Sequence, residues 1–309
     1  MSIVVFAPEK RALIWANAMK SQLPQECIEV YPEVENYEAI DYAVAWLPEP
    51  DVFAQFPNLK VVQSLGAGVD HIFNTQSIAE GLQITRIVDQ ALAKDMFEYV
   101  LTGIMNWMKG FGNFTRDQQR KVWNPLPYRR IKNTRVAIWG LGEIGSVIAT
   151  ELVKLGFDVQ GWSRTQKAII GVTGFSGQSG MLDSLSGCDV LINVLPLTQA
   201  TEGILNAKNL SYLNDGAYLI NVGRGGHLQE SDLSRLIESG RLSGALLDVF
   251  NLEPLPSNHT FWHLDGLTIT PHIAAITDQE SAISQIVENY QRFRKNMPLL
   301  HPVELKKGY

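Results

Sequence analysis

The segment VAIWGLGEIG, residues 136–145, limits the possible folds of this chain more than any other. It places three glycines in the order G-x-G-x-x-G between an apolar strand and the helical pattern that follows. The first glycine permits a tight turn, the second lets backbone amides approach a pyrophosphate, and the third lets helix and strand pack closely. A structural glycine turn is the alternative, but the strand–turn–helix context favours a dinucleotide site. The expected contacts are Gly140, Gly142, Glu143, Ile144 and Gly145.

Strand-like and helix-like runs alternate along most of the 309 residues, which predicts an α/β fold. We expect two Rossmann-like or flavodoxin-like domains with parallel sheets and an active site in the cleft between them. A substrate domain would comprise 1–94 and 280–309, because the amphipathic segment that opens at Thr277 or Asp278 can return to the first domain. The dinucleotide domain would comprise 95–279. Its six candidate strands are 135–140, 158–162, 189–194, 217–222, 244–249 and 267–270.

The region between the domains divides into two parts. Residues 91–111 form a long apolar helical pattern, whereas 116–134 is basic and aromatic and contains two prolines. That composition makes it a poor helix interior, so we expect a linker or an arm toward a second subunit. Trp123 lies in this arm. We expect it to pack on the surface, with contact to a partner subunit as the alternative.

Composition excludes several classes of function. The formal net charge is −6 and no basic stripe is present, which argues against nucleic-acid binding. No run approaches the ~20 apolar residues of a membrane-spanning helix, and the start MSIVVFAPEK resembles a first strand more than a signal peptide. Cys27 and Cys188 lie in apolar surroundings, which predicts two buried thiols in a reducing compartment. We therefore expect a soluble, cytoplasmic protein without a membrane partner.

The segment GWSRT lies where a dinucleotide site meets the adenine ribose, about twenty residues beyond the first glycine. An acidic residue there would hold the ribose of NAD, but it would repel a 2′-phosphate by about 4 kcal/mol at ~4 Å. An arginine attracts that phosphate instead, and each charge-assisted hydrogen bond contributes about 1.5–3 kcal/mol. A solvent-facing turn is the alternative. We expect NADPH/NADP as cofactor, with NADH/NAD as the weaker alternative, bound by Ser163, Arg164, Thr165 and Lys167.

Three charged side chains follow three different candidate strands. Arg224 follows AYLINVG, Asp248 ends GALLDV, and His272 follows LTITP. The carboxyl ends of parallel strands share one edge, which is where ligands bind in open α/β sheets. Each residue alone is often an ordinary surface residue, but three strands that deliver Arg, Asp and His to one edge indicate a site. Glu253 lies shortly beyond Asp248 and could reach the ring of His272.

An ordered set of motifs resembles the D-isomer-specific 2-hydroxyacid dehydrogenase family. These motifs are SLGAGVD, LPLTQATEGILN, NVGRGG, LLDVFNLEPLP and TPHIAA. Within the family, AWLPEPD, LGAGVDHIF and GWSRT look most like the glyoxylate/hydroxypyruvate reductase A branch. The resemblance implies an NADPH-dependent reductase of small 2-keto acids that acts as a homodimer.

The resemblance also implies residue roles. His272 would give a proton to the carbonyl oxygen, Glu253 would hold the imidazole and raise its pKa, and Arg224 would bind the substrate carboxylate. Asp248 would orient the nicotinamide carboxamide. The remaining expected cofactor contacts are Leu195, Pro196 and Val222. The expected substrate contacts, besides Arg224, are Trp46, Gly66, Ala67 and Gly68, with the amides of the last two completing the carboxylate site.

Several alternatives stay open. A dinucleotide-sensing interaction protein similar to a corepressor could share the fold, as could a D-2-hydroxyacid dehydrogenase for another substrate. Formate dehydrogenases of the family are disfavoured because they carry Gln where Glu253 stands, and the large phosphoglycerate dehydrogenases because the chain stops at Tyr309. His227 and Gln229 stand where the family often has an aliphatic residue and Asp, which leaves the hydrogen bonding of that loop open.

Two weaker candidates complete the list. Trp46 lies at the end of the candidate strand YAVAWLP and either walls a small substrate pocket or packs in the core. His259 and His263 are four residues apart, a spacing that binds metal on a helix, but the segment resembles a loop or a single turn. We expect no metal.

Overall fold

The computed structural model describes residues 2–73 and 81–304. The chain divides into two compact units, Met1–Asp89 with Thr277–Tyr309 and Gln90–Ile276. These boundaries lie a few residues before the expected ones, because the helix that opens the second unit already begins at Gln90. None of the helices in the described part of the chain has the length and hydrophobicity needed to span a membrane.

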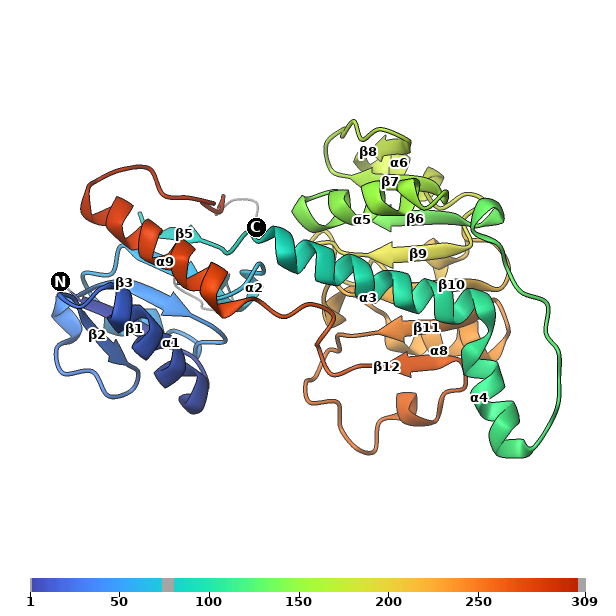
Figure 1. Ribbon diagram of the computed structural model, residues 1–309, viewed down its shortest axis with the longest axis horizontal. Helices are drawn as coiled ribbons and strands as arrows, with labels where there is room; N and C mark the ends of the chain where they lie inside the picture. Colours follow the sequence, from blue (N-terminus) through green and yellow to red (C-terminus); the bar gives the residue numbers. More distant parts are fainter. Residues whose placement is uncertain (1, 74–80, 305–309) are drawn as a thin grey trace. The chain divides into compact units, whose positions relative to one another are not determined.

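The first unit is built on a parallel sheet in the order β2-β1-β3-β4-β5 (Figure 1). Five strands are predicted in this region from the segments SIVVFAP, CIEVYP, YAVAWLP, LKVVQSLG and LQITRIV, and all five are confirmed. Their bounds are β1 Ser2–Phe6, β2 Cys27–Val30, β3 Ile40–Ala45, β4 Val61–Ser64 and β5 Gln83–Thr85. Every residue of the central strand β3 is buried, as expected of a parallel strand covered on both faces. The short helical elements are η1 Tyr37–Ala39, η2 Val52–Gln55 and α2 Asp70–Phe73.

Two helices from opposite ends of the sequence pack on this sheet, α1 Glu9–Gln22 and α9 Gln279–Arg294. The carboxylate of Asp278 accepts from the amide of Ser281 at 2.8 Å, which confirms the expected N-cap of α9. A buried polar cluster also ties α9 to the sheet. Asn289 donates to Gln63 at 2.8 Å, and Thr85 donates to the same Gln63 oxygen at 2.6 Å. The C-terminal helix is therefore part of the N-terminal unit.

The second unit contains a parallel sheet in the order β12-β11-β10-β9-β6-β7-β8. The six expected strands are confirmed, but the sheet has a seventh, which the sequence reasoning missed. This edge strand, β8, covers Val172–Ser176 and pairs with β7. The other bounds are β6 Arg135–Trp139, β7 Asp158–Ser163, β9 Val190–Asn193, β10 Ala217–Asn221, β11 Leu242–Leu247 and β12 Leu267–Ile269.

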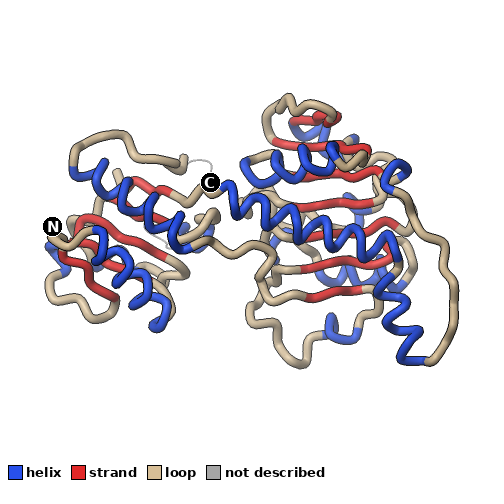
Figure 2. The backbone as a smooth tube through the Cα atoms, in the orientation of Figure 1, coloured by secondary structure: helices blue, strands red, loops and turns tan. Residues whose placement is uncertain are grey.

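Helices cover both faces of this sheet, which makes it doubly wound (Figure 2). One face packs against α3 Gln90–Lys109 and α5 Glu143–Lys154 through an apolar cluster that includes Val100, Ile104 and Ile148. The opposite face has its own cluster around Leu210 and Leu233. Its helical elements are α6 Gly177–Asp183, α7 Ala207–Leu210, α8 Glu230–Glu238 and η5 Thr260–His263. The expected α/β fold class is confirmed.

The arm after α3 differs from the expectation. Its first part is helical, since α4 covers Phe111–Arg120, and only the remainder is irregular up to η3 Ile131–Asn133. No residue of α4 is buried, and its two phenylalanines, Phe111 and Phe114, are exposed. The helix is short and mostly polar, so the sequence did not mark it as a helix that packs in a core. The expectation that Trp123 packs on the surface is wrong, because its side chain is 97% exposed.

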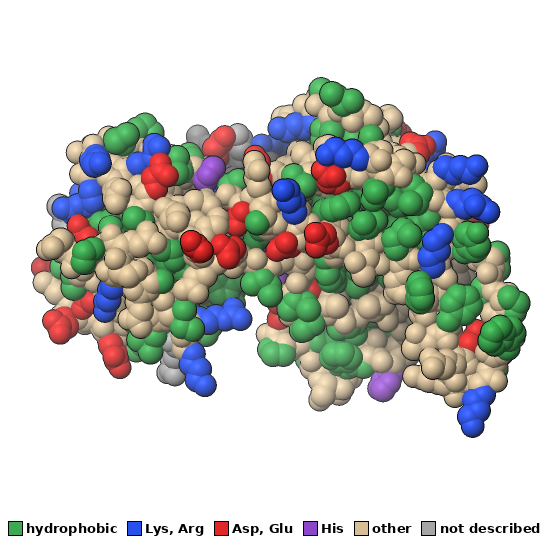
Figure 3. Space-filling view, viewed as in Figure 1, with side chains coloured by type: hydrophobic (Ala, Val, Ile, Leu, Met, Phe, Trp, Pro, Cys, Tyr) green, Lys and Arg blue, Asp and Glu red, His purple; other side chains and the backbone are tan. Residues whose placement is uncertain are grey.

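The two cysteines differ from each other. Cys188 is buried as expected, and burial raises the pKa of its thiol to about 12. Cys27 is exposed, so its expected burial is wrong: it begins β2, an edge strand of the first sheet. On the face shown in Figure 3, basic side chains are interspersed with acidic and apolar ones.

Candidate active site

The glycine turn joins β6 to α5, and each of its glycines has a distinct environment. Gly140 has φ +104° and donates its amide to the carbonyl of Trp162 at 2.9 Å, which places the turn beside the end of β7. A Cβ on Gly145 would lie 1.8 Å from the carbonyl oxygen of Gly140, so helix and strand could not approach each other with any larger residue. A Cβ on Gly142 would meet no atom of the described residues within 4 Å. The first and third glycines serve the fold, and the second leaves space above the amides of α5 at Glu143 and Ile144.

The loops after β9 and β10 border this turn. Gly140 packs against the backbone of Val194 and Leu195. A Cβ on Gly140 would lie 2.9 Å from the carbonyl oxygen of Val194. Val222 follows β10 and donates its amide to Asn193 at 3.1 Å. Pro196 accepts a hydrogen bond from the hydroxyl of Thr201 at 2.7 Å. The expected cofactor contacts Leu195, Pro196 and Val222 therefore follow neighbouring strands at one sheet edge, beside the turn.

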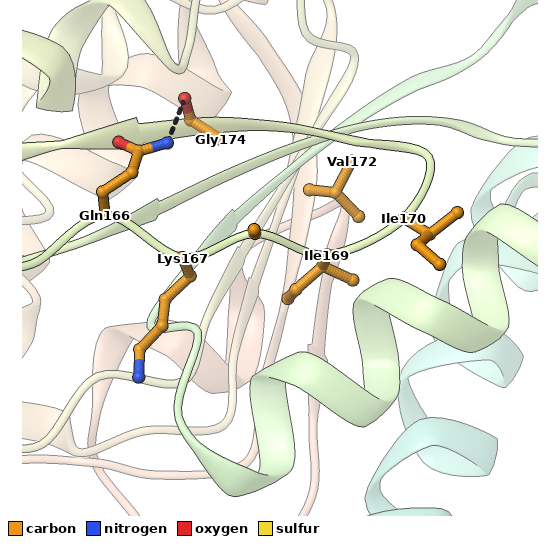
Figure 4. A pocket seen from close by; sticks show the side chains of 7 residues that line it. Gln166, Lys167, Ile169, Ile170, Val172 and Gly174 are labelled. Atoms are coloured by element: carbon orange, nitrogen blue, oxygen red, sulfur yellow. Dashed lines mark hydrogen bonds between the residues drawn. The ribbon is translucent and has the colours of Figure 1, made fainter.

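The GWSRT segment forms the end of β7 and the loop after it. Ser163 is the last residue of the strand, and its hydroxyl donates to the carbonyl of Thr165 at 2.8 Å. Arg164, Thr165 and Lys167 are exposed. Residues 166–170, Val172 and Gly174 line a shallow hollow of about 330 Å³. The side-chain amide of Gln166 donates to the carbonyl of Gly174, whereas the side chain of Lys167 extends away from Gly174 (Figure 4). The segment presents cationic side chains directly beside the glycine turn.

His272 and Glu253 form a close pair. Nδ1 of His272 lies 2.7 Å from Oε2 of Glu253, whose other oxygen accepts the amide of Phe250 at 2.9 Å. The hydrogen bond from Glu253 raises the pKa of His272 above its ordinary value, although burial and Arg224 oppose it. Burial tends to raise the pKa of Glu253, but the bonds from His272 and Phe250 outweigh it and lower that pKa. The imidazole is thus held by Nδ1, and Nε2 is the nitrogen that can transfer a proton.

Asp248 is more constrained than the sequence suggested. It follows β11 and is 1% exposed. One of its oxygens accepts from the hydroxyl of Thr270 at 2.6 Å and from the amide of Ile273 at 2.9 Å, and the other accepts from the amide of Ala274 at 2.9 Å. These donors flank His272, which has a left-handed backbone with φ +55°. Asp248 therefore shapes the loop of the candidate proton donor, a role that sequence reasoning missed. Its expected contact with a nicotinamide stays a prediction.

Arg224 follows β10 and is half-buried. Its Nη1 donates to the carbonyl of Gly223 at 2.8 Å, and its charge lowers the pKa values of both Glu253 and His272. The next residue, Gly225, packs so tightly that a Cβ would lie 1.9 Å from the carbonyl carbon of Phe250. The Arg224 loop and the segment that leads to Glu253 are thereby in direct contact. Arg224, Glu253 and His272 form one charged group in the second unit.

The expected substrate loop lies in the first unit, after β4. Trp46 follows β3, is half-buried and contacts His71, with ring centroids 4.8 Å apart. A Cβ on Gly66 would lie 2.6 Å from the Trp46 ring, so a larger residue at this position would clash with the indole. The amides of Ala67 and Gly68 have no acceptor among the described residues. This loop thus offers an aromatic surface and two backbone donors. The location of the active site between the two units stays a prediction.

His259 is the N-cap of η5 and His263 is its last residue, so this segment is a single turn, as expected. Nε2 of His259 pairs with Glu230 at 3.2 Å, and its Nδ1 accepts the amide of Phe261 at 3.2 Å. Across residues 2–73 and 81–304, no group of three or more His, Cys, Asp or Glu side chains is arranged to hold a metal ion.

Comparison with known proteins places this geometry in a family. Residues 101–274 match the model of the D-isomer specific 2-hydroxyacid dehydrogenase NAD-binding domain. The chain is 38% identical to a glyoxylate/hydroxypyruvate reductase A from Yersinia enterocolitica over 315 aligned residues, which cover all of both chains. A D-isomer specific 2-hydroxyacid dehydrogenase from Xanthobacter autotrophicus, solved in complex with NADPH and MES, is similar with a TM-score of 0.93 and 35% identity. That match covers 100% of this chain and 99% of the other.

A second solved structure is similar in the same way. It is an NADPH-dependent glyoxylate/hydroxypyruvate reductase from Sinorhizobium meliloti in complex with NADP and sulfate, with a TM-score of 0.90, 32% identity and complete coverage of both chains. These matches extend over the glycine turn, the Arg224 loop and the His272 loop. The chain therefore belongs to the D-isomer specific 2-hydroxyacid dehydrogenase family.

Proposed function

We propose that this protein reduces small 2-keto acids with NADPH, converting glyoxylate to glycolate and hydroxypyruvate to D-glycerate. The observation that carries the proposal is the His272–Glu253 pair at 2.7 Å, within the electrostatic influence of Arg224. A cationic imidazole can protonate a carbonyl oxygen, and a guanidinium can bind the carboxylate next to that carbonyl. Together they match the two functional groups of a 2-keto acid.

The proton follows a short route. NADPH, when bound, supplies the hydride that C2 of the keto acid receives. As negative charge develops on the carbonyl oxygen, His272 gives it the proton on Nε2, and the C=O bond becomes C–OH. Glu253 stays ionised, because its pKa is lowered, and stabilises the imidazolium before transfer. Solvent then reprotonates His272, so that the keto acid, NADPH and one proton yield the hydroxy acid and NADP⁺.

The cofactor preference rests on the loop after β7. Arg164 and Lys167 bring positive charge to the point where the adenine ribose lies in a doubly wound sheet. The hydroxyls of Ser163 and Thr165 add donors for phosphate oxygens. The two solved relatives described above were captured with NADPH or NADP, which supports the same choice here. NADH is the weaker alternative because it has no 2′-phosphate for Arg164 to bind.

The substrate would be held from both units. Arg224 would bind the carboxylate, and the amides of Ala67 and Gly68 would complete its site, with Trp46 limiting the space beside it. The oxygens of Asp248 already accept three hydrogen bonds, so any contact with the nicotinamide carboxamide would be added to these. We also propose a cytoplasmic homodimer. The exposed Trp123 and the apolar residues near it, Phe111, Phe114, Val122 and Tyr128, support an arm that packs on a second copy.

The test is a spectrophotometric assay. Purified protein, NADPH and a panel of 2-keto acids are followed at the nicotinamide absorbance band, with NADH and a simple aldehyde as controls. We expect oxidation of NADPH with glyoxylate or hydroxypyruvate and little with the aldehyde, which has no carboxylate for Arg224. A protein that binds NADPH but oxidises it with no keto acid would refute the reductase and favour the dinucleotide sensor. Turnover only with larger keto acids would favour a dehydrogenase for another substrate.

A further inference from the structure

His227 is a buried residue of the second unit, three positions after Arg224 in the same loop. It ends the single turn η4, Gly225–His227, and its side chain is completely buried. Because burial of an imidazole is costly unless its nitrogens are hydrogen-bonded, the partners of this ring identify what it does.

Both ring nitrogens of His227 are engaged. Nδ1 accepts the backbone amide of Arg224 at 3.1 Å and the side-chain amide of Asn193 at 2.9 Å. Nε2 lies 3.2 Å from the carbonyl oxygen of Pro196. A backbone amide can only donate and a carbonyl can only accept, so the ring is neutral and carries its hydrogen on Nε2. Protonation of Nδ1 would break the bond to Arg224.

The side chains around the ring are also hydrogen-bonded to one another and to the Arg224 backbone. Asn193 also donates to Asn221 at 2.9 Å, and Asn221 in turn donates to the carbonyl of Arg224 at 3.1 Å. The backbone of Arg224 is therefore held on both sides, at its amide by His227 and at its carbonyl by Asn221. Asn193 is the last residue of β9 and Asn221 is the last residue of β10, and both side chains are completely buried.

The two nitrogens thus reach two functional loops. The Nδ1 side holds the residue that would bind the substrate carboxylate, and the Nε2 side holds Pro196 in the loop expected to border the cofactor. A histidine that merely fills the core would bond to any nearby backbone. This ring bonds directly to one residue from each of the two expected binding sets.

We propose that His227 is a positioning residue whose Nδ1 sets the backbone of Arg224 for the keto acid and whose Nε2–H sets the Pro196 loop for the cofactor. The inference rests on the proposed function. It predicts that the two halves of the ring can be separated: loss of the acceptor weakens binding of the keto acid, and loss of the donor weakens binding of NADPH.

Two amide variants separate the two halves. His227→Asn can keep an acceptor near Nδ1 but does not reach Pro196, whereas His227→Gln can extend an N–H toward Pro196 but loses the acceptor. We expect His227→Gln to raise KM for the keto acid about three- to tenfold, with KM for NADPH changed less than about twofold. We expect His227→Asn to show the opposite pattern. In both variants kcat should change less than the affected KM, because neither amide touches the reacting atoms.

A matched histidine provides the control. His259 also accepts a backbone amide at Nδ1 and bonds through Nε2, but its partners are Phe261 and Glu230. His259→Asn and His259→Gln should leave both KM values within about twofold of wild type, because these partners lie outside the expected binding sets. Thermal melting of all four variants, with and without NADPH, identifies any that fail to fold.

The outcomes separate the two proposals. Opposite KM patterns in the two His227 variants support the positioning role. An active wild type whose His227→Asn and His227→Gln variants change both KM values equally, or only lower the melting temperature, would overturn this inference alone. A wild type that reduces no 2-keto acid would overturn the proposed function and the inference with it.

Discussion

The two ends of the carboxyl edge of the seven-stranded sheet are organised differently. At the β10–β12 end, His272, Glu253 and Asp248 have fixed partners, and three donors converge on Asp248 alone. At the β7 end, Arg164 and Thr165 are exposed on a short loop. The first end is held by several hydrogen bonds, and the second is an exposed loop whose positive charge can attract a phosphate. Substitutions at the first end should therefore alter chemistry, and those at the second should alter only the choice of cofactor.

The largest effect is expected from His272→Asn at the β10–β12 end. Loss of the proton donor should lower kcat about 10²- to 10⁴-fold, because the developing oxyanion no longer receives a proton. The binding of NADPH should stay close to wild type, since the glycine turn and the β7 loop are unchanged. Nicotinamide fluorescence titration alongside steady-state kinetics measures both. Equal loss of binding and turnover would show that the two ends are not independent.

A smaller effect is expected from Arg164→Asp at the β7 end. The variant should lower kcat/KM with NADPH about 10- to 100-fold relative to NADH, because attraction of the 2′-phosphate becomes repulsion. Lys167→Ala serves as a control, since it removes a more distant charge and should change the ratio by no more than a few-fold. The measurement is kcat/KM with each cofactor at low and high salt. Parallel losses with NADPH and NADH would contradict the assignment.

The smallest effect, a displaced pH profile, is expected from Glu253→Gln. Wild-type kcat/KM for keto-acid reduction should be level at low pH and decline as pH rises through the pKa of His272, which lies above 6.5 because Glu253 raises it. In Glu253→Gln the decline should move to lower pH, since the neutral amide no longer stabilises the imidazolium. Kinetics across a pH series measures the displacement. An unchanged midpoint would assign the titration to another group.

The His272–Glu253 pair contributes to folding stability over a limited pH range. Because the pKa of His272 is raised on folding, its contribution to stability is present below its ordinary value of 6.5 and is lost as pH rises through the raised value. Because the pKa of Glu253 is lowered, its contribution is present above its ordinary value of 4.5 and is lost as pH falls through the lowered value. Chemical denaturation of wild type and Glu253→Gln should differ most between these limits.

Sequence reasoning predicted features that depend on local pattern. Buried strands, the glycine turn and the cap at Asp278 each leave a signal within a few residues, and all of them are present. It missed β8 because Val172–Ser176 is an edge strand with a glycine and no fully buried residue. It missed α4 because that helix is only ten residues long, is mostly polar and buries none of its residues.

The same distinction applies to the candidate site. Arg224, Asp248 and His272 could be found because each follows a recognisable strand. The partners of Asp248 and His227 could not be found, because they are hydrogen bonds between loops that are distant in sequence. Asp248 reaches Ala274, and His227 reaches Pro196. The sequence shows that His227 stands where the family often has an aliphatic residue. The hydrogen-bond partners of its ring become visible only in the folded structure.

The buried bond between Asn289 and Gln63 has a consequence for synthesis of the chain. Residues of α9 such as Ile286 and Tyr290 belong to the core of the first sheet, and Tyr290 donates to Glu26 at 2.6 Å. Residues 90–276 are continuous and can fold as they leave the ribosome, whereas the first eighty-nine residues lack one wall of their core until α9 has been made. The segment that is translated first can therefore complete its core only after the last helix of the chain has been synthesised.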